Sequence, residues 1–189
     1  MHRKNTVIRR KGRGIRAYLN DFQRIVSGEY VYIGATYTFV SDSGKSRKSV
    51  LRLLWAFCGL AAASGVAQGF IAAGGMRNCA YVLIPFGLEI ICAGCVIWAL
   101  IQLSTNKDPI REYVYVATVD VLPRRCILTA ISAGLSCVGE LIYALLHLGE
   151  NTAGTWFLAL LMAVAAASSV MAFRVIRSTY WERHEHSAN

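Results

Sequence analysis

Apolar residues are concentrated in four long runs along the chain, and mostly polar segments separate the runs. The runs cover 53–73, 80–103, 126–147 and 154–173. A helix needs about 20 residues to cross the hydrocarbon core of a bilayer, and each run reaches that length. The pattern therefore predicts an all-α polytopic membrane protein, a bundle of four transmembrane helices joined in pairs by two short loops, "GGMRNC" and "LGENTA".

Composition supports the membrane class. Of the 189 residues, 55% are hydrophobic and only 16% are charged, which does not suit an ordinary water-soluble domain. The segment before the first run, 1–52, is mostly polar, whereas a cleavable signal peptide turns apolar close to its start. The first apolar run is therefore expected to be a retained span.

Basic residues predict the orientation of the bundle. Of the 20 Lys and Arg residues, 12 lie in 1–52, four in 104–125 and three in 174–183, and only Arg77 falls in a loop on the other side. The positive-inside rule places both termini in the cytosol, with the plasma membrane as the expected location. Seven basic residues are assigned to topology or to anionic lipid headgroups: Arg13, Arg16, Arg24, Arg47, Lys48, Arg124 and Arg125. Because topology accounts for these charges, nucleic-acid binding is not expected.

The N-terminal segment has the pattern of an amphipathic helix. Within 13–27, apolar residues recur at helical spacing and Arg13, Arg16 and Arg24 lie on the opposite face. Such a helix can lie on the membrane surface or dock on the cytosolic ends of the protein's own helices, and the sequence does not choose between the two.

The motif Glu-Tyr-Val-Tyr occurs twice, at 29–32 and at 112–115. Each copy lies in a segment rich in strand-forming residues, 29–40 and 112–121, that leads through a connector to a basic pair and a transmembrane hairpin. We interpret this as two tandem units related by an axis along the membrane normal. The two extended segments would then pair as a short cytosolic two-stranded β element.

This interpretation divides the chain into four parts. They are a basic amphipathic segment at 1–28, a first repeat at 29–103, a second repeat at 104–173 and a cytosolic tail at 174–189. Small residues at four-residue spacing, such as Ala61 and Gly65, are expected to bring the helices close together, because lipid tails compete equally for larger apolar side chains.

Two acidic residues stand inside the apolar runs, Glu89 in the second and Glu140 in the third. A charged carboxylate at that depth costs about 2.5–3.5 kcal/mol on insertion scales, so it is expected to be protonated, paired or next to a polar cavity. We take Glu89 and Glu140, with Gln68 and Ser136 as polar neighbours, as a candidate intramembrane polar or ion-binding site. The alternative is that each neutral carboxyl only makes an interhelical hydrogen bond.

Other motifs point to little chemistry. Cys92 and Cys95 form a C-x-x-C inside a span, without a second pair, and are interpreted as apolar packing residues. "SGKS" at 43–46 lacks the earlier glycine of a phosphate-binding loop, and "RHEH" at 183–186 offers two histidines without a third ligand. No metal, cofactor or catalytic residue is predicted, and an enzyme is not expected.

Three functional classes remain. The first is a non-catalytic accessory or interaction subunit of a membrane complex, which the small bundle and its small-residue helix faces favour. The second is a small homo-oligomeric transporter or channel that uses Glu89 and Glu140. The third, an intramembrane enzyme, has no motif in its support. The expected partners are the lipid bilayer, anionic headgroups, and either a second copy of the chain or another membrane protein.

Overall fold

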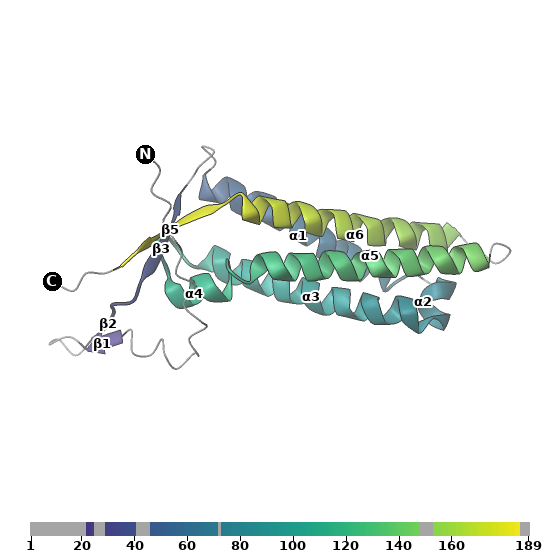
Figure 1. The fold of residues 1–189 in the computed structure, drawn as a ribbon, viewed down its shortest axis with the longest axis horizontal. Helices are drawn as coiled ribbons and strands as arrows, with labels where there is room; N and C mark the ends of the chain where they lie inside the picture. The colour runs from purple at the N-terminus through teal and green to yellow at the C-terminus, as the bar shows by residue number, and fades with distance from the viewer. Residues whose placement is uncertain (1–21, 25–28, 41–45, 72, 148–152, 186–189) are drawn as a thin grey trace, which may run out of the picture.

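Four long helices dominate the structure. The computed structural model describes residues 22–24, 29–40, 46–71, 73–147 and 153–185. The long helices are α1 (Arg47–Gln68), α3 (Ala80–Thr105), α5 (Leu122–Leu146) and α6 (Ala153–Arg177). Each is long and apolar enough to cross a membrane, and Figure 1 shows them side by side as one elongated bundle. The prediction of four apolar helices packed together is confirmed.

The helices pack in the order in which they occur in the chain. Helix α1 contacts α3, α3 contacts α5, α5 contacts α6, and α6 contacts α1, which closes the bundle. A tandem repeat about the membrane normal would give this arrangement, but so would an ordinary up-and-down bundle. The two-repeat organisation therefore stays a prediction.

The first span begins earlier than its hydrophobicity indicates. Ser46 caps α1, because its side-chain oxygen accepts a hydrogen bond from the backbone N–H of Ser49 at 3.3 Å. The helix ends at Gln68, five residues before the predicted limit at Ala73. The following loop contains a five-residue helix, α2 (Gly74–Asn78), which sequence analysis interpreted as a plain connection.

Short strands gather at the end of the bundle opposite α2. Strands β1 (Phe22–Arg24) and β2 (Tyr30–Tyr32) form an antiparallel pair. Strands β4 (Ile110–Arg111), β3 (Thr36–Val40) and β5 (Tyr180–His184) form a three-stranded antiparallel sheet in that order. We call this end of the bundle the sheet end and the opposite one the α2 end (Figure 1). The predicted extended character of 29–40 is confirmed.

The predicted pairing of 29–40 with 112–121 is wrong. Residues Glu112–Ala117 form a helix, α4, and β3 pairs instead with the two residues just before it, Thr36 with Arg111 and Tyr37 with Ile110. The helix buries Val114, and the hydroxyl of Thr118, which follows the helix, donates to the Val114 carbonyl at 2.6 Å from a buried position. These contacts of the helical form therefore override the strand preference of the tyrosines and valines.

The prediction of a helix over 13–27 is also wrong in the part of that segment that the structure describes. Within 13–27, residues Phe22–Arg24 form strand β1, paired with β2. The Phe22 ring packs edge-on against Tyr32 at 5.3 Å between centroids, a cross-strand contact that favours the extended form. Arg13 and Arg16 lie outside the described residues.

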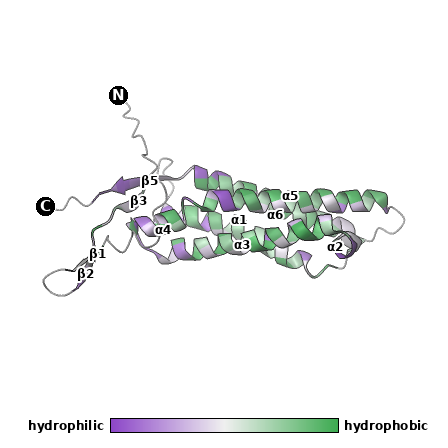
Figure 2. Ribbon diagram, turned by 60° about the horizontal axis from the view of Figure 1, so that its bottom comes forward, coloured by the Kyte–Doolittle hydropathy of each residue, from purple (hydrophilic) through white to green (hydrophobic). Residues whose placement is uncertain are grey.

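Basic residues are segregated along the bundle. In the described part of the chain, the Lys and Arg residues lie at the sheet end, except for Arg77 in α2, which lies at the α2 end. Among the predicted topology residues, Lys48 and Arg124 are exposed, whereas Arg125 donates to the Cys95 carbonyl at 2.9 Å. Figure 2 shows that the long helices are mostly hydrophobic and that strand β5 at the sheet end is hydrophilic.

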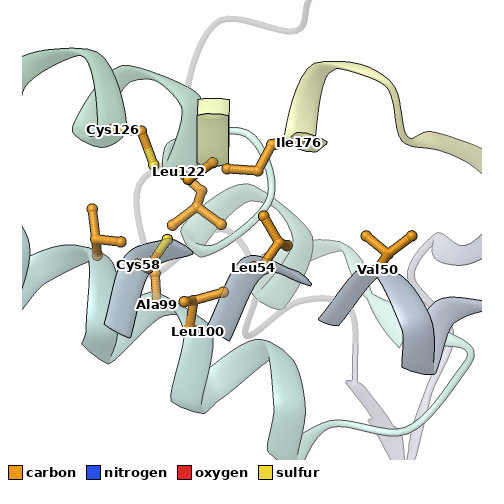
Figure 3. Close-up of a cluster of buried hydrophobic side chains, with 10 residues drawn as sticks. Val50, Leu54, Cys58, Ala99, Leu100, Leu122, Cys126 and Ile176 are labelled. Atoms are coloured by element: carbon orange, nitrogen blue, oxygen red, sulfur yellow. The ribbon is translucent and has the colours of Figure 1, made fainter. Parts of the chain in front are cut away.

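The core near the sheet end is apolar. Its buried side chains come from all four long helices, and Figure 3 shows most of them. They are Val50, Leu54, Cys58, Val96, Ala99, Leu100, Leu122, Cys126, Ala172 and Ile176. The two cysteines of this set are free thiols that contribute to packing.

Arg47 ties the sheet end of the bundle together. From the first residue of α1, its guanidinium donates to the Leu103 carbonyl at 2.9 Å and to the Asn106 carbonyl at 2.6 Å at the end of α3. It also pairs with Asp108 at 3.3 Å and lies over the Trp181 ring of β5 at 6.0 Å. One residue that was predicted to set topology therefore also joins α1, α3 and the sheet.

We expect the Arg47→Ala variant to lose about 2 kcal/mol of stability, since hydrogen bonds to charged groups contribute roughly 1.5–3 kcal/mol. Thermal unfolding of the purified protein in detergent measures this loss. The matched control is Arg52→Ala, which removes an exposed arginine from the same helix. Equal unfolding temperatures for the two variants would contradict the role given to Arg47.

Candidate functional site

Buried polar side chains occupy the half of the core toward the α2 end. Gln68 of α1, Glu89 of α3, and Ser136 and Glu140 of α5 each have 0% of their surface exposed. These are the four residues that sequence analysis selected, and they come from three of the four long helices. The buried carboxyl and amide groups are thus confined to the half of the core toward the α2 end, whereas buried hydroxyls, such as those of Thr129 and Ser169, also occur in the other half.

Gln68 and Glu89 form a direct pair between α1 and α3. The Gln68 side-chain amide, Nε2, donates to Glu89 Oε1 at 3.3 Å inside the bundle. Gly65, one turn before Gln68, lets the two helices approach, because a Cβ there would lie 3.0 Å from Ile90 Cδ1 and 3.3 Å from Glu89 Oε1. The expectation that Gln68 is a neighbour of Glu89 is confirmed.

Glu140 lies under the short helix α2. A Cβ added at Gly75 would overlap the Glu140 carboxyl, and one added at Gly74 would overlap the phenol of Tyr143, one turn further along α5. Two consecutive glycines therefore let the α2 backbone lie directly on these side chains. Sequence analysis missed this contact, because "GG" in a short loop is equally typical of a turn that touches nothing.

A backbone carbonyl of α3 faces this region as well. Pro85 lies inside α3 and has no N–H, so it cannot donate to the carbonyl of Tyr81 one turn earlier. Gly139 of α5 packs there: a Cβ on it would lie 3.4 Å from the Tyr81 carbonyl oxygen and 3.1 Å from Val82 Cγ2. The Tyr81 carbonyl, which lacks its usual helical donor because of Pro85, therefore lies beside Gly139, the residue just before Glu140.

Most of the side-chain polar atoms of the four site residues lack a partner. Six buried side-chain polar atoms have no hydrogen-bond partner among the described residues, and five belong to the four site residues. The five are Gln68 Oε1, Glu89 Oε2, Ser136 Oγ, Glu140 Oε1 and Glu140 Oε2. An unsatisfied buried polar group costs about 1–3 kcal/mol, so five in one region is a large local cost.

The two acids do not form one pair. Helices α3 and α5 are antiparallel, and the Arg125–Cys95 hydrogen bond and the Gly139–Val82 contact set their register. Glu89 comes seven residues after Val82 in α3, and Ser132 comes seven residues before Gly139 in α5. Because the helices are antiparallel, Glu89 and Ser132 lie at the same level. At 1.5 Å per residue, Ser136 lies about 6 Å and Glu140 about 12 Å further toward the α2 end. The site is therefore two acidic positions with Ser136 at an intermediate level.

Other sequence candidates lie away from this site. All six cysteines are free, and Cys95 is exposed on α3. His184 is exposed in β5, and His186 lies outside the described residues. In the part of the chain that the structure describes, no three His, Cys, Asp or Glu side chains come together in a way that could hold a metal ion.

Comparison of the chain with protein-family models, curated proteins and solved structures finds no match.

We expect Gly65→Val to destabilise the bundle by about 1–3 kcal/mol, the usual cost of forcing extra atoms into a packed core. The added side chain would push against Ile90 and the Gln68–Glu89 pair. Gly59→Val is the matched control in the same helix, since a Cβ there meets no other atom within 4 Å. Thermal unfolding in detergent compares the two, and a larger loss in Gly59→Val would contradict the packing described for α1 and α3.

Proposed function

We propose that the protein is a small membrane transporter or channel that moves protons or a small cation by way of Glu89 and Glu140. One observation carries the proposal: five oxygen atoms of four fully buried side chains have no partner among the described residues and lie in the same half of the core. A bundle that serves only as a scaffold gains nothing from these unsatisfied groups.

The chemistry of the five atoms supports a positively charged ligand. All five are oxygens, the donor type that protons and hard cations prefer. An isolated carboxylate is very unfavourable in a low-dielectric interior, so a proton or a cation must neutralise it. The ion pairs found between described residues involve Arg47 and Arg183, both at the sheet end, and neither reaches these acids.

The wider structure fits a protein that works in a bilayer. Large apolar side chains are exposed along the bundle, for example Leu60, Ile91, Trp98 and Leu135, and lipid or a second copy of the chain would cover them. The crowding of basic residues at the sheet end supports a cytosolic position for that end and for both termini. Homo-oligomerisation belongs to the same proposal.

A non-catalytic accessory subunit is the second candidate. Its support is that the bundle is closed around the acids, since Glu89 and Glu140 have no exposed surface. A closed bundle with a Gln68–Glu89 hydrogen bond also suits a purely structural role. A second protein that co-purifies in a fixed stoichiometry from mild detergent would favour this candidate.

We expect Glu89→Gln to abolish proton uptake into vesicles that contain only this protein and a pH-sensitive dye, with a potassium diffusion potential as the driving force. Glutamine keeps the size and hydrogen-bonding capacity of the side chain but cannot carry a proton. Glu182→Gln, an exposed substitution in β5, is the matched control and should leave uptake unchanged.

Proton uptake by the Glu89→Gln variant equal to that of the unsubstituted protein, at equal reconstitution and oligomer size, would remove Glu89 from the mechanism. If the unsubstituted protein itself takes up no protons, the same vesicles loaded with Na⁺ or K⁺ test a cation other than the proton. Absence of flux for all three ions would favour the accessory role.

A further inference from the structure

We propose that Glu140 is a separate proton-binding station that receives protons from the α2 end of the bundle, with the Gly74–Gly75 turn of α2 as its cap. This inference rests on the proposed function and adds to it the direction from which protons reach Glu89. It follows from the surroundings of Glu140, from the contact with α2 and from the confinement of the buried carboxyl groups to one half of the core.

Among the described residues, no ion pair is formed by Glu140. From α2 it meets the glycine backbone, and Arg77 of that helix is exposed. Ionisable groups in its surroundings are Tyr81 of α3, Cys79 just before that helix, and Tyr143 of its own helix, whose ring stacks on His147 at 4.3 Å. Helix α6 has no titratable residue between Ala153 and Ala165. The carboxyl is therefore surrounded by neutral groups, which suits a residue that gains and loses a proton.

The cap over Glu140 is small and is held by few residues. Helix α2 has five residues, and the backbone of its Gly75 lies directly on the carboxyl. Ala73, just before it, is 1% exposed and packs with Val82 and Leu158, which anchors one end of the turn. A displacement of this turn would expose Glu140 while the contacts between the four long helices stay in place. Of the two buried acids, Glu140 is therefore the one that needs the smaller structural change to become exposed to water.

The second carboxyl and its nearest polar neighbours lie inward from Glu140. Ser136 lies one turn further into the bundle, and the Gln68–Glu89 pair follows about one more turn beyond it by the α3–α5 register. Toward the sheet end, the next layer contains the buried hydroxyls of Thr129 and Ser169 beside Cys58, and Leu100 and Leu122 lie beyond it. The α2 side of Glu89 therefore offers a second carboxyl, Glu140, with the Ser136 hydroxyl at an intermediate level, whereas the layers between Glu89 and Leu122 offer no carboxyl among the described residues.

The test is hydrogen–deuterium exchange at the two carboxyl groups, followed by infrared spectroscopy of the carboxylic C=O stretch after transfer of reconstituted protein into D₂O. Bands are assigned with Glu89→Gln and Glu140→Gln. We expect Glu140 to exchange several-fold faster than Glu89. Ser136→Ala should slow exchange at Glu89 and leave exchange at Glu140 unchanged. Gly75→Ala should change the rate at Glu140 several-fold, because its methyl group displaces either the cap or the carboxyl.

Gly94→Ala is the control for the glycine variant, since a Cβ at that position meets nothing within 4 Å. Unfolding temperatures of all variants in detergent check that each still folds. Exchange at Glu89 as fast as at Glu140, no carboxylic band for Glu140 at any pH, or equal behaviour of Gly75→Ala and Gly94→Ala would overturn the inference. Exchange reports access and not flux, so a failure of the transport proposal leaves this test able to decide the route.

Discussion

The structure depends on the cost of placing oxygen atoms without partners inside an apolar bundle. Backbone polar groups satisfy each other within the helices, so a membrane bundle can be built from apolar side chains alone. This chain instead buries two carboxyl groups, an amide and a hydroxyl in one half of its core. Close helix packing at Gly65 and at Gly74–Gly75 holds these groups in the interior, and the apolar layers at the sheet end supply packing that offsets their cost.

The two ends of the bundle also differ in how many tertiary contacts hold them. The sheet end is tied by Arg47 and by pairing of β3 with β4 and β5, so segments far apart in the chain are held together there. The α2 end has a five-residue helix that lies on Glu140 through glycine backbone. An end with many tertiary contacts and an end with few, on either side of buried acids, fit the proposed ion translocation, since access must open on one side while the other stays closed.

Sequence patterns predicted the parts of this structure that depend on hydrophobicity alone. The four apolar helices and the burial of Glu89, Glu140, Gln68 and Ser136 followed from run length and from the positions of polar residues inside the runs. Contacts between distant segments could not be predicted in this way. The second Glu-Tyr-Val-Tyr became α4 because Val114 is buried in the tertiary structure, and the role of Gly75 depends on how α2 folds back onto α5.

The most direct test of the central claim is whether the Glu89 carboxyl changes its protonation state in the folded protein. Infrared difference spectra between pH values, recorded on reconstituted protein and compared with Glu89→Gln, isolate its carboxylic C=O band. A Glu89 that works in proton or cation movement should show a band that changes in amplitude with pH, or with Na⁺ or K⁺, while the protein remains folded. A band of constant amplitude under all these conditions would show a permanently neutral, structural side chain and would contradict the account.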